Sequence, residues 1–148
     1  MADITTRRAT VQDSEPVALL FDQYRQFYGQ PSDTEAATGF INARLDQNDS
    51  TILVASAGDT QIGFTQLYPS FSSVSMAPIW ILNDLFVAES HRRRGVGRAL
   101  MNAAQEFATN DGAKRLCLAT GEDNVSAQAL YESQGWNPDG FLHYEFEL

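Results

Sequence analysis

Residues 85–98, Leu-Phe-Val-Ala-Glu-Ser-His-Arg-Arg-Arg-Gly-Val-Gly-Arg, constrain the fold of this chain more than any other stretch. The pattern predicts the end of a buried strand, a short turn and the first turn of a helix. Gly95 and Gly97 allow the backbone of the turn to approach a ligand closely and to adopt conformations that other residues avoid. The stretch therefore indicates a strand–turn–helix unit with a ligand site at its turn.

The same turn has the chemistry of an anion site. A helix that begins there presents N–H groups without intrahelical acceptors and the positive end of its dipole, and both suit phosphate groups. Four of the chain's 10 Lys and Arg residues, Arg92, Arg93, Arg94 and Arg98, lie within this turn, and guanidinium groups can bind phosphate oxygens in pairs. The alternative is an ordinary solvated turn. The strand before it and the helix after it favour the phosphate site.

Composition limits the class of protein. A chain of 148 residues with 43% hydrophobic residues is long and apolar enough for one globular domain with a substantial core. The net charge of −9 argues against general nucleic-acid binding, which requires a basic surface. An acidic chain is compatible with a cationic substrate, although acidity for solubility alone is the favoured explanation.

Cysteine content and hydropathy indicate the compartment. Cys117 is the single cysteine, so no internal disulfide can form, and its apolar neighbours indicate a core residue rather than a nucleophile. The N-terminal residues contain no apolar signal segment, and no apolar run approaches membrane-spanning length. We therefore expect a cytoplasmic protein with neither a membrane nor a nucleic acid as partner.

Hydrophobic periodicity predicts a mixture of strands and helices. The expected strands are residues 3–9, 51–57, 61–68, 79–87, 114–119 and 141–148. Four helices are expected: one between Asp13 and Gly29, one opened by the capping pattern Ser32-Asp33-Thr34-Glu35, one from the glycine turn to Asn110, and one over 125–134. We expect 61–68 to pair antiparallel with 51–57, and 114–119 to lie parallel to 79–87 through an ordinary crossover.

The first two helices contain neighbouring aromatic residues. The plain interpretation is that these rings pack against a sheet. The functional interpretation is that Phe27, Tyr28 and the loop 29–33 form one wall of a substrate pocket.

Asn83 and Asp84 interrupt the apolar strand 79–87. Strand interiors disfavour both residue types, and a buried carboxylate is costly without a partner. Such a pair marks either a β-bulge or a functional site.

Three segments together resemble the GCN5-related N-acetyltransferases (GNAT): the strand Asn83–Val87, the turn Arg92–Gly97, and Asn124 followed by Ala129-Leu130-Tyr131-Glu132-Ser133-Gln134-Gly135-Trp136. The turn is similar to the family's Arg/Gln-x-x-Gly-x-Gly/Ala signature. The order and spacing of the segments match over most of the chain, most closely over 80–136. The short C-terminal end is similar to a compact branch that includes histone- and polyamine-type acetyltransferases.

The resemblance implies one acetyltransferase domain over 1–148, of α/β class. Its sheet would be V-shaped and mostly antiparallel, with a central parallel strand pair and about four flanking helices. Acetyl-coenzyme A would lie where strands 79–87 and 114–119 separate, with its pantetheine on Leu85–Val87 and its pyrophosphate on amides of Arg93–Arg98. The cofactor-binding residues implied in this way are Leu85, Phe86, Val87, Arg92, Arg93, Arg94, Gly95, Val96, Gly97, Arg98, Asn124 and Tyr131.

Asn124 and Tyr131 are about two helical turns apart and would share one helix face. The resemblance assigns Asn124 to the pantetheine and Tyr131 to the coenzyme sulfur. A phenol hydroxyl can donate a proton to the departing thiolate as a general acid. The alternative is that Tyr131 is a core aromatic beside Leu130.

The acceptor half of the site is less clearly marked. An alkylamine has a pKa of about 10.4 and must lose a proton before it attacks. Some family members have Glu just before the Asp of this strand, whereas this chain has Asn83. Asp84 is the nearest carboxylate, Glu122 is another candidate base, and the choice stays open. The expected catalytic residues are Tyr131, Asp84 and Asn83, and the expected substrate-binding residues are Phe27, Tyr28 and Asn83.

We therefore predict an N-acetyltransferase that moves an acetyl group directly from acetyl-CoA to a small-molecule or peptidyl primary amine, with no metal. Holding the two reactants together supplies much of the rate, so no covalent enzyme intermediate is required. The alternatives are a non-catalytic acyl-CoA-binding or protein-interaction module with the same fold, and an enzyme for another acyl group. A homodimer could form through the exposed edge of the last strand, which carries Tyr144 and Phe146.

Overall fold

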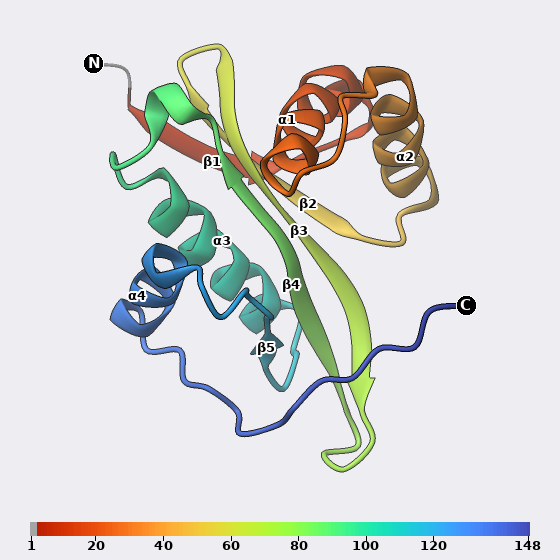
Figure 1. Ribbon diagram of the computed structural model, residues 1–148, viewed down its shortest axis with the longest axis vertical. Helices are drawn as coiled ribbons and strands as arrows, with labels where there is room; N and C mark the ends of the chain where they lie inside the picture. Colours follow the sequence, from red (N-terminus) through yellow and green to blue (C-terminus); the bar gives the residue numbers. More distant parts are fainter. Residues whose placement is uncertain (1–2) are drawn as a thin grey trace. The chain divides into compact units, whose positions relative to one another are not determined.

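The computed structural model describes residues 3–148, which divide into two compact units, one ending at Leu118 and the other comprising Ala119–Leu148 (Figure 1). The first unit contains β1 (Ile4–Arg8), the 3₁₀ helix η1 (Val11–Asp13), α1 (Ser14–Phe27), α2 (Thr34–Gln47), β2 (Thr51–Ala57), β3 (Thr60–Ser72), β4 (Ala77–Val87), the 3₁₀ helix η2 (Glu89–His91), α3 (Val96–Asn110) and β5 (Leu116–Cys117). The second unit contains α4 (Val125–Ser133).

The five strands form one sheet in the order of the chain. Strands β1 to β4 are antiparallel, and β5 lies parallel to β4, which confirms the predicted mixed α/β class. The parallel pair lies at the edge of this sheet rather than in its centre. It is also short, because β5 pairs with β4 only at Trp80 and Ile81, so the predicted strand 114–119 is reduced to its middle.

The sheet is covered on both faces within the first unit (Figure 1). Ile52 and Val54 of β2 pack in a cluster with α1 and α2, whereas Leu53 and Ala55 pack in clusters with α3. Successive strand residues point to opposite faces. Burial on both faces therefore explains why this strand is an unbroken apolar run.

The face toward α1 and α2 is rich in aromatic rings. Phe21 of α1 stacks on Phe40 of α2 with ring centroids 5.4 Å apart, and Tyr24 meets Phe64 of β3 at 5.8 Å and Phe86 of β4 at 6.1 Å. The plain interpretation of the aromatic residues, packing against the sheet, is therefore confirmed for these rings.

Asp13 precedes α1 as expected, but its side chain does not cap that helix. It accepts hydrogen bonds from Arg7 at 2.7 and 2.9 Å, from the Thr10 amide at 2.8 Å and from Gln61 at 2.9 Å. The Arg7 guanidinium holds the pKa of the Asp13 carboxyl well below its usual range. Asp13 thus ties β1 and the start of β3 to the entry of α1.

The expected β-bulge is present in β4. Gln66 of β3 pairs with Asp84 and Leu67 pairs with Leu82, so Asn83 has no partner in β3. The extra residue changes which face the strand presents. Leu82 packs with α3, whereas Phe86 packs with α1, although strict alternation would put both on one face.

The predicted strand over 141–148 is wrong, because the structure has no strand there. The alternating pattern is present, but a strand requires backbone partners and a buried face. Phe141, Leu142, Tyr144 and Phe146 are 76–90% exposed. The strand edge on which the homodimer prediction depended is therefore absent from the described residues, and the dimer stays a prediction.

The hairpin of β3 and β4 is longer than expected. The serine-rich segment after residue 68 extends β3 to Ser72, and the tip exposes Phe71, Val74 and Met76. No helix within residues 3–148 combines the length and apolarity needed to cross a membrane.

Candidate active site

The turn between β4 and α3 has the backbone geometry of an anion cradle. Arg93 and Gly95 have positive φ angles of 63° and 81°, and Gly95 is the N-cap of α3 without a side-chain capping bond. The first backbone bond of the helix runs from Ala99 N to Gly95 O at 3.0 Å, so the Val96 and Gly97 amides lie ahead of the intrahelical ladder.

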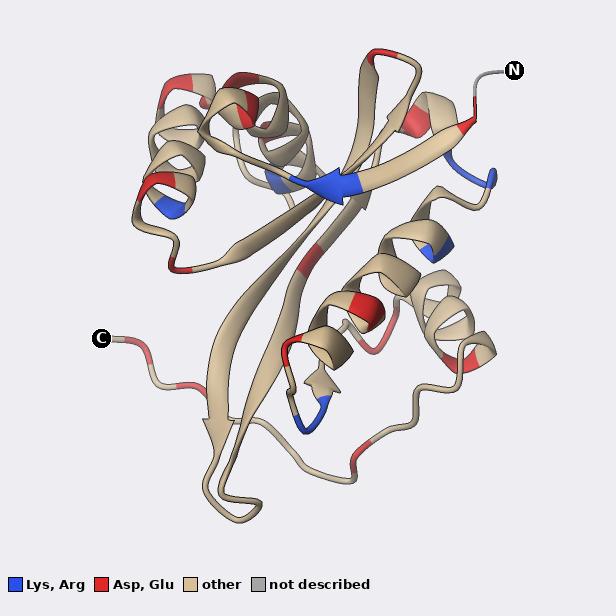
Figure 2. Ribbon diagram, turned by 180° about the vertical axis from the view of Figure 1, so that it is seen from behind, with Lys and Arg blue, Asp and Glu red and all other residues tan. Residues whose placement is uncertain are grey.

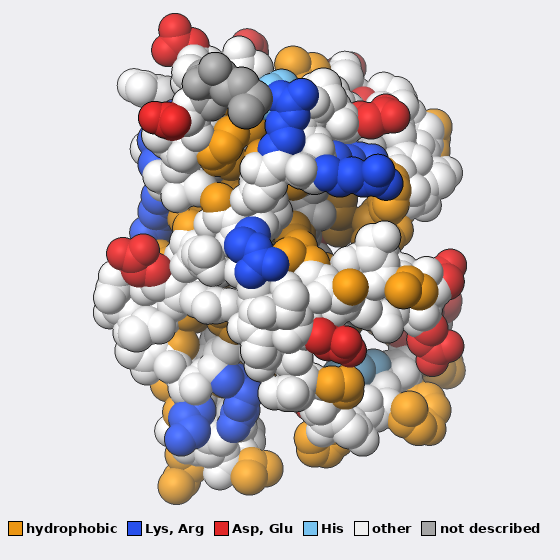
Figure 3. Space-filling model, turned by 90° about the vertical axis from the view of Figure 1, so that its left-hand side faces the viewer, with side chains coloured by type: hydrophobic (Ala, Val, Ile, Leu, Met, Phe, Trp, Pro, Cys, Tyr) orange, Lys and Arg blue, Asp and Glu red, His pale blue; other side chains and the backbone are white. Residues whose placement is uncertain are grey.

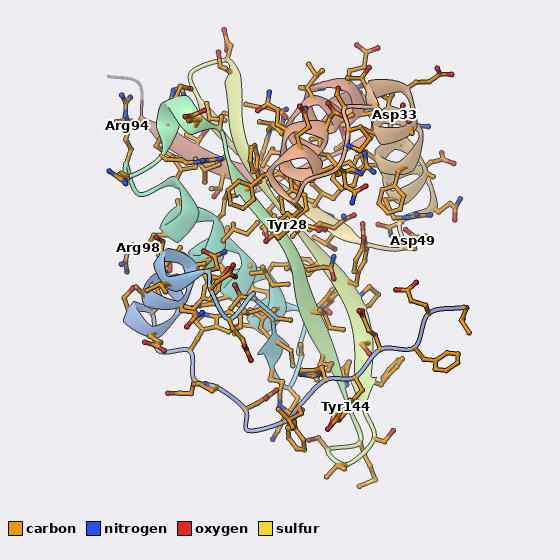
Figure 4. The ribbon with its side chains drawn as sticks, in the orientation of Figure 1. Tyr28, Asp33, Asp49, Arg94, Arg98 and Tyr144 are labelled. Carbon is orange, nitrogen blue, oxygen red and sulfur yellow. The ribbon has the colours of Figure 1, made fainter. Side chains whose placement is uncertain are left out.

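The surroundings of this turn fit a phosphate group. The first turn of α3 contains no acidic residue, and a Cβ placed on Gly95 would meet no atom within 4 Å. Arg94 and Arg98 extend away from the ribbon on the same side (Figure 4). In the space-filling view of this side, Lys and Arg side chains lie in the upper part and again in a separate group lower down (Figure 3). Open space, uncapped amides and cationic side chains are what the pyrophosphate of a coenzyme requires.

One edge of β4 is available beside this turn. The pairing with β5 ends at Ile81, whereas the pairing with β3 continues to Val87. Ala88 N donates to Ile62 O of β3 at 2.8 Å, and alternate residues of an antiparallel strand direct their backbone groups to the same side. The backbone N–H and C=O of Phe86 therefore point toward β3, whereas those of Leu85 and Val87 point to the opposite edge.

Arg92 is placed differently from the other arginines of the turn. Its Nε donates to the Val87 carbonyl at 2.9 Å. Its guanidinium carbon lies 5.6 Å from the ring centroid of Phe27 and 5.4 Å from that of Phe86. This arginine is therefore engaged with α1 and β4.

The bulge carries a chain of buried polar side chains. Ser50 Oγ donates to Gln66 Oε1 at 2.9 Å, and Gln66 Nε2 donates to Asp84 Oδ2 at 2.9 Å. The neighbouring Asn83 donates its amide to Asp84 Oδ1 at 3.1 Å, although Asn83 itself is exposed. Asp84 is only 5% exposed and Gln66 is completely buried.

Both donors to the Asp84 carboxylate are neutral amides. Strands β3 and β4 carry Asp84 as their only charged residue (Figure 2). A buried carboxylate without a cationic partner is costly to keep in a fold. A cationic group bound from outside would supply that partner.

Tyr68 belongs to the same face and was not predicted from the sequence. It follows Gln66 by two positions in β3 and is half-buried. Burial raises the pKa of its hydroxyl, and the negative charge of Asp84 raises it further. A tyrosine in a strand is usually a packing residue. The sequence around Tyr68 therefore gave no sign that its hydroxyl lies on the face of Asp84.

Phe27 and Tyr28 lie at the end of α1, where they are 60% and 59% exposed (Figure 4). The ring of Tyr28 packs edge-on against Tyr24 at 5.1 Å and against Phe27 at 5.3 Å. These exposed rings lie side by side, and Tyr24 connects them to Phe86 of β4 at 6.1 Å. That they form one wall of a substrate pocket stays a prediction.

A buried aspartate holds the loop that follows this wall. Asp22 accepts hydrogen bonds from the Asp33 amide at 2.7 Å, from Ser32 Oγ at 2.7 Å and from Gln26 at 3.0 Å. These bonds, led by the one from the Asp33 backbone, lower the pKa of the Asp22 carboxyl. The N-cap of α2 is Asp33, which accepts from Ala36 N at 3.1 Å, while Ser32 binds Asp22 instead.

The second unit contains the other predicted residues. Asn124 is the N-cap of α4, and its side-chain oxygen accepts from the Ala127 amide at 3.4 Å. Tyr131 lies on the same helix, with its ring 6.3 Å from that of Trp136. Glu122 lies in the loop before α4, where its carbonyl accepts from Gln128 at 3.0 Å.

The geometry therefore brings Asn83 and Asp84 together with each other, and brings Arg92 together with Phe27. Two polar residues that complete the bulge, Ser50 and Gln66, were missed. Gln66 is one of several polar residues in β3, among them Gln61 and Thr65, so its polarity alone gave no distinct signal. Its partners lie 16 and 18 positions away, so their pairing could not be read from local pattern.

Comparison with known proteins identifies the family. The model of the acetyltransferase (GNAT) family matches residues 16–136. The "Uncharacterized N-acetyltransferase YhfO" of Bacillus subtilis (strain 168) is 50% identical over 139 residues, which cover 93% of each chain. The chain therefore belongs to the GNAT acetyltransferase family and is an acetyltransferase.

Solved structures agree with this assignment. The crystal structure of a probable acetyltransferase superposes with a TM-score of 0.92 at 39% identity and covers 97% of each chain. The aminoglycoside N-acetyltransferase AAC(6')-Iy in complex with CoA has the same fold, with a TM-score of 0.83 at 22% identity, and covers 99% of this chain and 96% of its own.

Proposed function

We propose that this protein transfers an acetyl group from acetyl-CoA to a cationic primary amine, and that residues 1–148 form one N-acetyltransferase domain. The continuous family match from residue 16 to residue 136 supports one domain, since it crosses the boundary between the units. The single observation that carries the choice of amine is the buried Asp84 carboxylate, whose hydrogen-bond donors are both neutral.

Acetyltransferases of this family use acetyl-CoA as acyl donor, and AAC(6')-Iy is known with CoA bound. In this chain the Val96 and Gly97 amides, with Arg94 and Arg98, would hold the pyrophosphate at the start of α3. The outward backbone groups of Leu85 and Val87 would pair with the pantetheine arm, although the Val87 carbonyl already accepts from Arg92. These assignments rest on uncapped helix amides and on an unpaired strand edge.

The amine would bind on the face of the sheet toward α1 and α2. Asp84 attracts the ammonium form, and the rings of Tyr28 and Tyr24 offer faces on which a cation is favourable. The amine must lose one proton before its nitrogen attacks the thioester carbon. Asp84 or water ordered by it takes that proton, and Tyr68 lies on the same face as a second polar group.

Tyr131 acts as the general acid. As the new C–N bond forms, the C–S bond breaks and the departing sulfur takes the phenol proton of Tyr131. The nitrogen then loses its second proton, which returns through water to the phenolate of Tyr131. Asn124 keeps the helix of Tyr131 capped, and its amide group would bind the pantetheine. The cytoplasm is the compartment we propose for this reaction, because acetyl-CoA, which enzymes of this class consume, is present there.

An acetyl-transfer screen tests the proposal. Purified protein is mixed with acetyl-CoA and a panel of amines that includes a polyamine, an aminoglycoside, free lysine and a lysine peptide. Release of the coenzyme thiol and the mass of the acetylated product are measured. We expect turnover with cationic amines, and a loss of about 100-fold in kcat for Tyr131→Phe with little change in CoA affinity.

Three outcomes would contradict parts of the proposal. Tight CoA binding without turnover on any amine indicates a non-catalytic acyl-CoA-binding module. Turnover confined to a donor such as succinyl-CoA or propionyl-CoA indicates another acyl group. Full activity of Tyr131→Phe removes this tyrosine from the mechanism.

A further inference from the structure

Arg92 contacts three different elements at once. Its backbone belongs to the glycine turn, its Nε donates to Val87 O of β4 at 2.9 Å, and its guanidinium lies over the rings of Phe27 in α1 and Phe86 in β4 at 5.6 and 5.4 Å. A planar guanidinium stacks on aromatic faces and donates in its own plane at the same time. These contacts connect the turn with the end of α1.

The contacts continue from Phe27 toward the proposed amine site. Phe27 meets Tyr28 at 5.3 Å, and Tyr28 meets Tyr24 at 5.1 Å. Phe27 is nevertheless 60% exposed, so little packing other than the guanidinium and Tyr28 holds its ring. The position of this aromatic wall therefore depends on Arg92, a residue of the turn between β4 and α3. Because this turn is the proposed site of the acyl donor, we call it the donor turn.

The backbone of the turn is also the part that a bound pyrophosphate would fix. Arg93, the next residue, is in the left-handed region with φ 63°, which is unfavourable for a residue with a side chain. A ligand bound to the Val96 and Gly97 amides restricts the turn and with it the direction in which Arg92 leaves the backbone. The same ligand thereby restrains the guanidinium under Phe27.

We propose that Arg92 is a positioning residue that couples the donor turn to the aromatic wall at the end of α1, and that it is not a phosphate ligand. This inference rests on the proposed function, because it requires CoA to bind at the turn. Coupling between two sites is reciprocal, so an amine bound at Tyr28 strengthens CoA binding by the same factor as CoA strengthens binding of the amine.

The test uses CoA alone as probe and needs no knowledge of the acceptor. The full chain is labelled with 4-fluorophenylalanine at its 9 Phe positions, and the fluorine resonance of Phe27 is assigned by its absence from Phe27→Leu. CoA is titrated into wild type, Arg92→Gln and Arg94→Gln while calorimetry measures the dissociation constant of each. Arg94→Gln is the matched control, because it removes the same charge from the same turn.

We expect the Phe27 resonance of wild type to shift on saturation with CoA. In Arg92→Gln the shift falls to less than half, while the dissociation constant stays within about threefold of wild type. In Arg94→Gln CoA binds about tenfold more weakly, as loss of a charge-assisted bond to phosphate predicts, and the full shift returns at saturation.

Two results would overturn the inference while leaving the proposed function intact. One is a full Phe27 shift in Arg92→Gln at saturation. The other is a loss of CoA affinity in Arg92→Gln as large as in Arg94→Gln, which would make Arg92 a phosphate ligand. Absence of CoA binding by wild type would instead contradict the proposed function, and the coupling with it.

Discussion

The two faces of the sheet in the first unit bury different types of side chain. The face toward α3 is formed mostly by aliphatic residues, with one aromatic pair, Trp80 and Phe107, whose ring centroids are 5.1 Å apart. The face toward α1 and α2 carries aromatic rings and, at the bulge, the buried polar chain of Ser50, Gln66 and Asp84. Among the described residues the first face buries no charged side chain, whereas the second keeps the buried charge of Asp84, which a stable core would avoid.

This difference indicates on which face of the sheet the active site lies. Features that lower stability persist when function requires them. The bulge at Asn83 changes the face to which the following residues of β4 point. As a result Leu82 packs with α3, whereas Phe86 packs with α1. We therefore expect substitutions on the α3 face to change stability alone, and those at the bulge to change turnover.

The largest expected effect is on turnover in Asp84→Asn. This change keeps the size of the side chain but removes the charge that would pair with the amine and accept its proton. We expect kcat/KM for the amine to fall by about 100-fold or more, with CoA affinity unchanged in calorimetry. Retention of more than a third of wild-type kcat/KM would show that this carboxylate does not act on the amine.

Gln66→Leu removes the buried donor to Asp84 and leaves Ser50 without its acceptor. We expect a loss of about 1–3 kcal/mol in the free energy of unfolding and about a tenfold loss of kcat/KM, because the carboxylate is no longer held. Thr65→Val is the matched control, since Thr65 Oγ1 donates to the backbone carbonyl of Asp84 at 2.7 Å. It should lower stability with turnover within about twofold of wild type. Equal losses of turnover in both variants would mean that Gln66 acts only through stability.

Gly63→Ala tests the opposite face. A Cβ at this position would lie 2.9 Å from Phe86 O, 3.2 Å from Leu100 Cδ1 and 3.3 Å from Val96 Cγ1. We expect urea denaturation to show a loss of about 1–3 kcal/mol from overpacking. Gly39→Ala in α2, where a Cβ would meet nothing within 4 Å, should instead gain up to about 1 kcal/mol from helix propensity. A neutral Gly63→Ala would show that α3 is free to move away from the sheet.

The smallest effect concerns Asp22 and depends on pH. Because its pKa is lowered in the folded state, its contribution to stability is complete above the unfolded pKa of about 3.9 and is lost as pH falls through the folded value. Asp22→Asn should therefore lower the free energy of unfolding by about 1–2 kcal/mol at pH 7, and by less at pH 3. Asp46→Asn, at an exposed aspartate of α2, should change stability by less than about 0.5 kcal/mol at both values. A difference between wild type and Asp22→Asn that grows toward acid would contradict this assignment.

Much of the fold could be predicted because its signals are local. Helix spacing, glycine at turns and apolar runs identified four helices and the antiparallel strands. Asn83 and Asp84 were recognised as a bulge or a site from the cost of polar residues in a strand, and the bulge is confirmed. The turn at Gly95 was predicted from its glycines, and its left-handed φ agrees with that reason.

The rest depended on contacts between distant segments. The alternation over 141–148 describes only how side chains would point if a strand formed. It does not show whether a neighbouring strand is present to bind the backbone. The contact between the Arg92 guanidinium and the ring of Phe27, which is far away in the chain, could not be read from the sequence of the turn. Gln66 and Ser50 became visible as partners of Asp84 only when the strands were placed side by side.

The free energy of unfolding of Asp84→Asn tests the central claim most directly. If the carboxylate is kept for the amine and not for the fold, replacing it with a neutral amide removes an uncompensated buried charge. Urea denaturation should then show stability equal to that of wild type or higher by up to about 2 kcal/mol. A loss of more than about 1 kcal/mol would contradict the account, because it would make Asp84 a structural residue of the bulge.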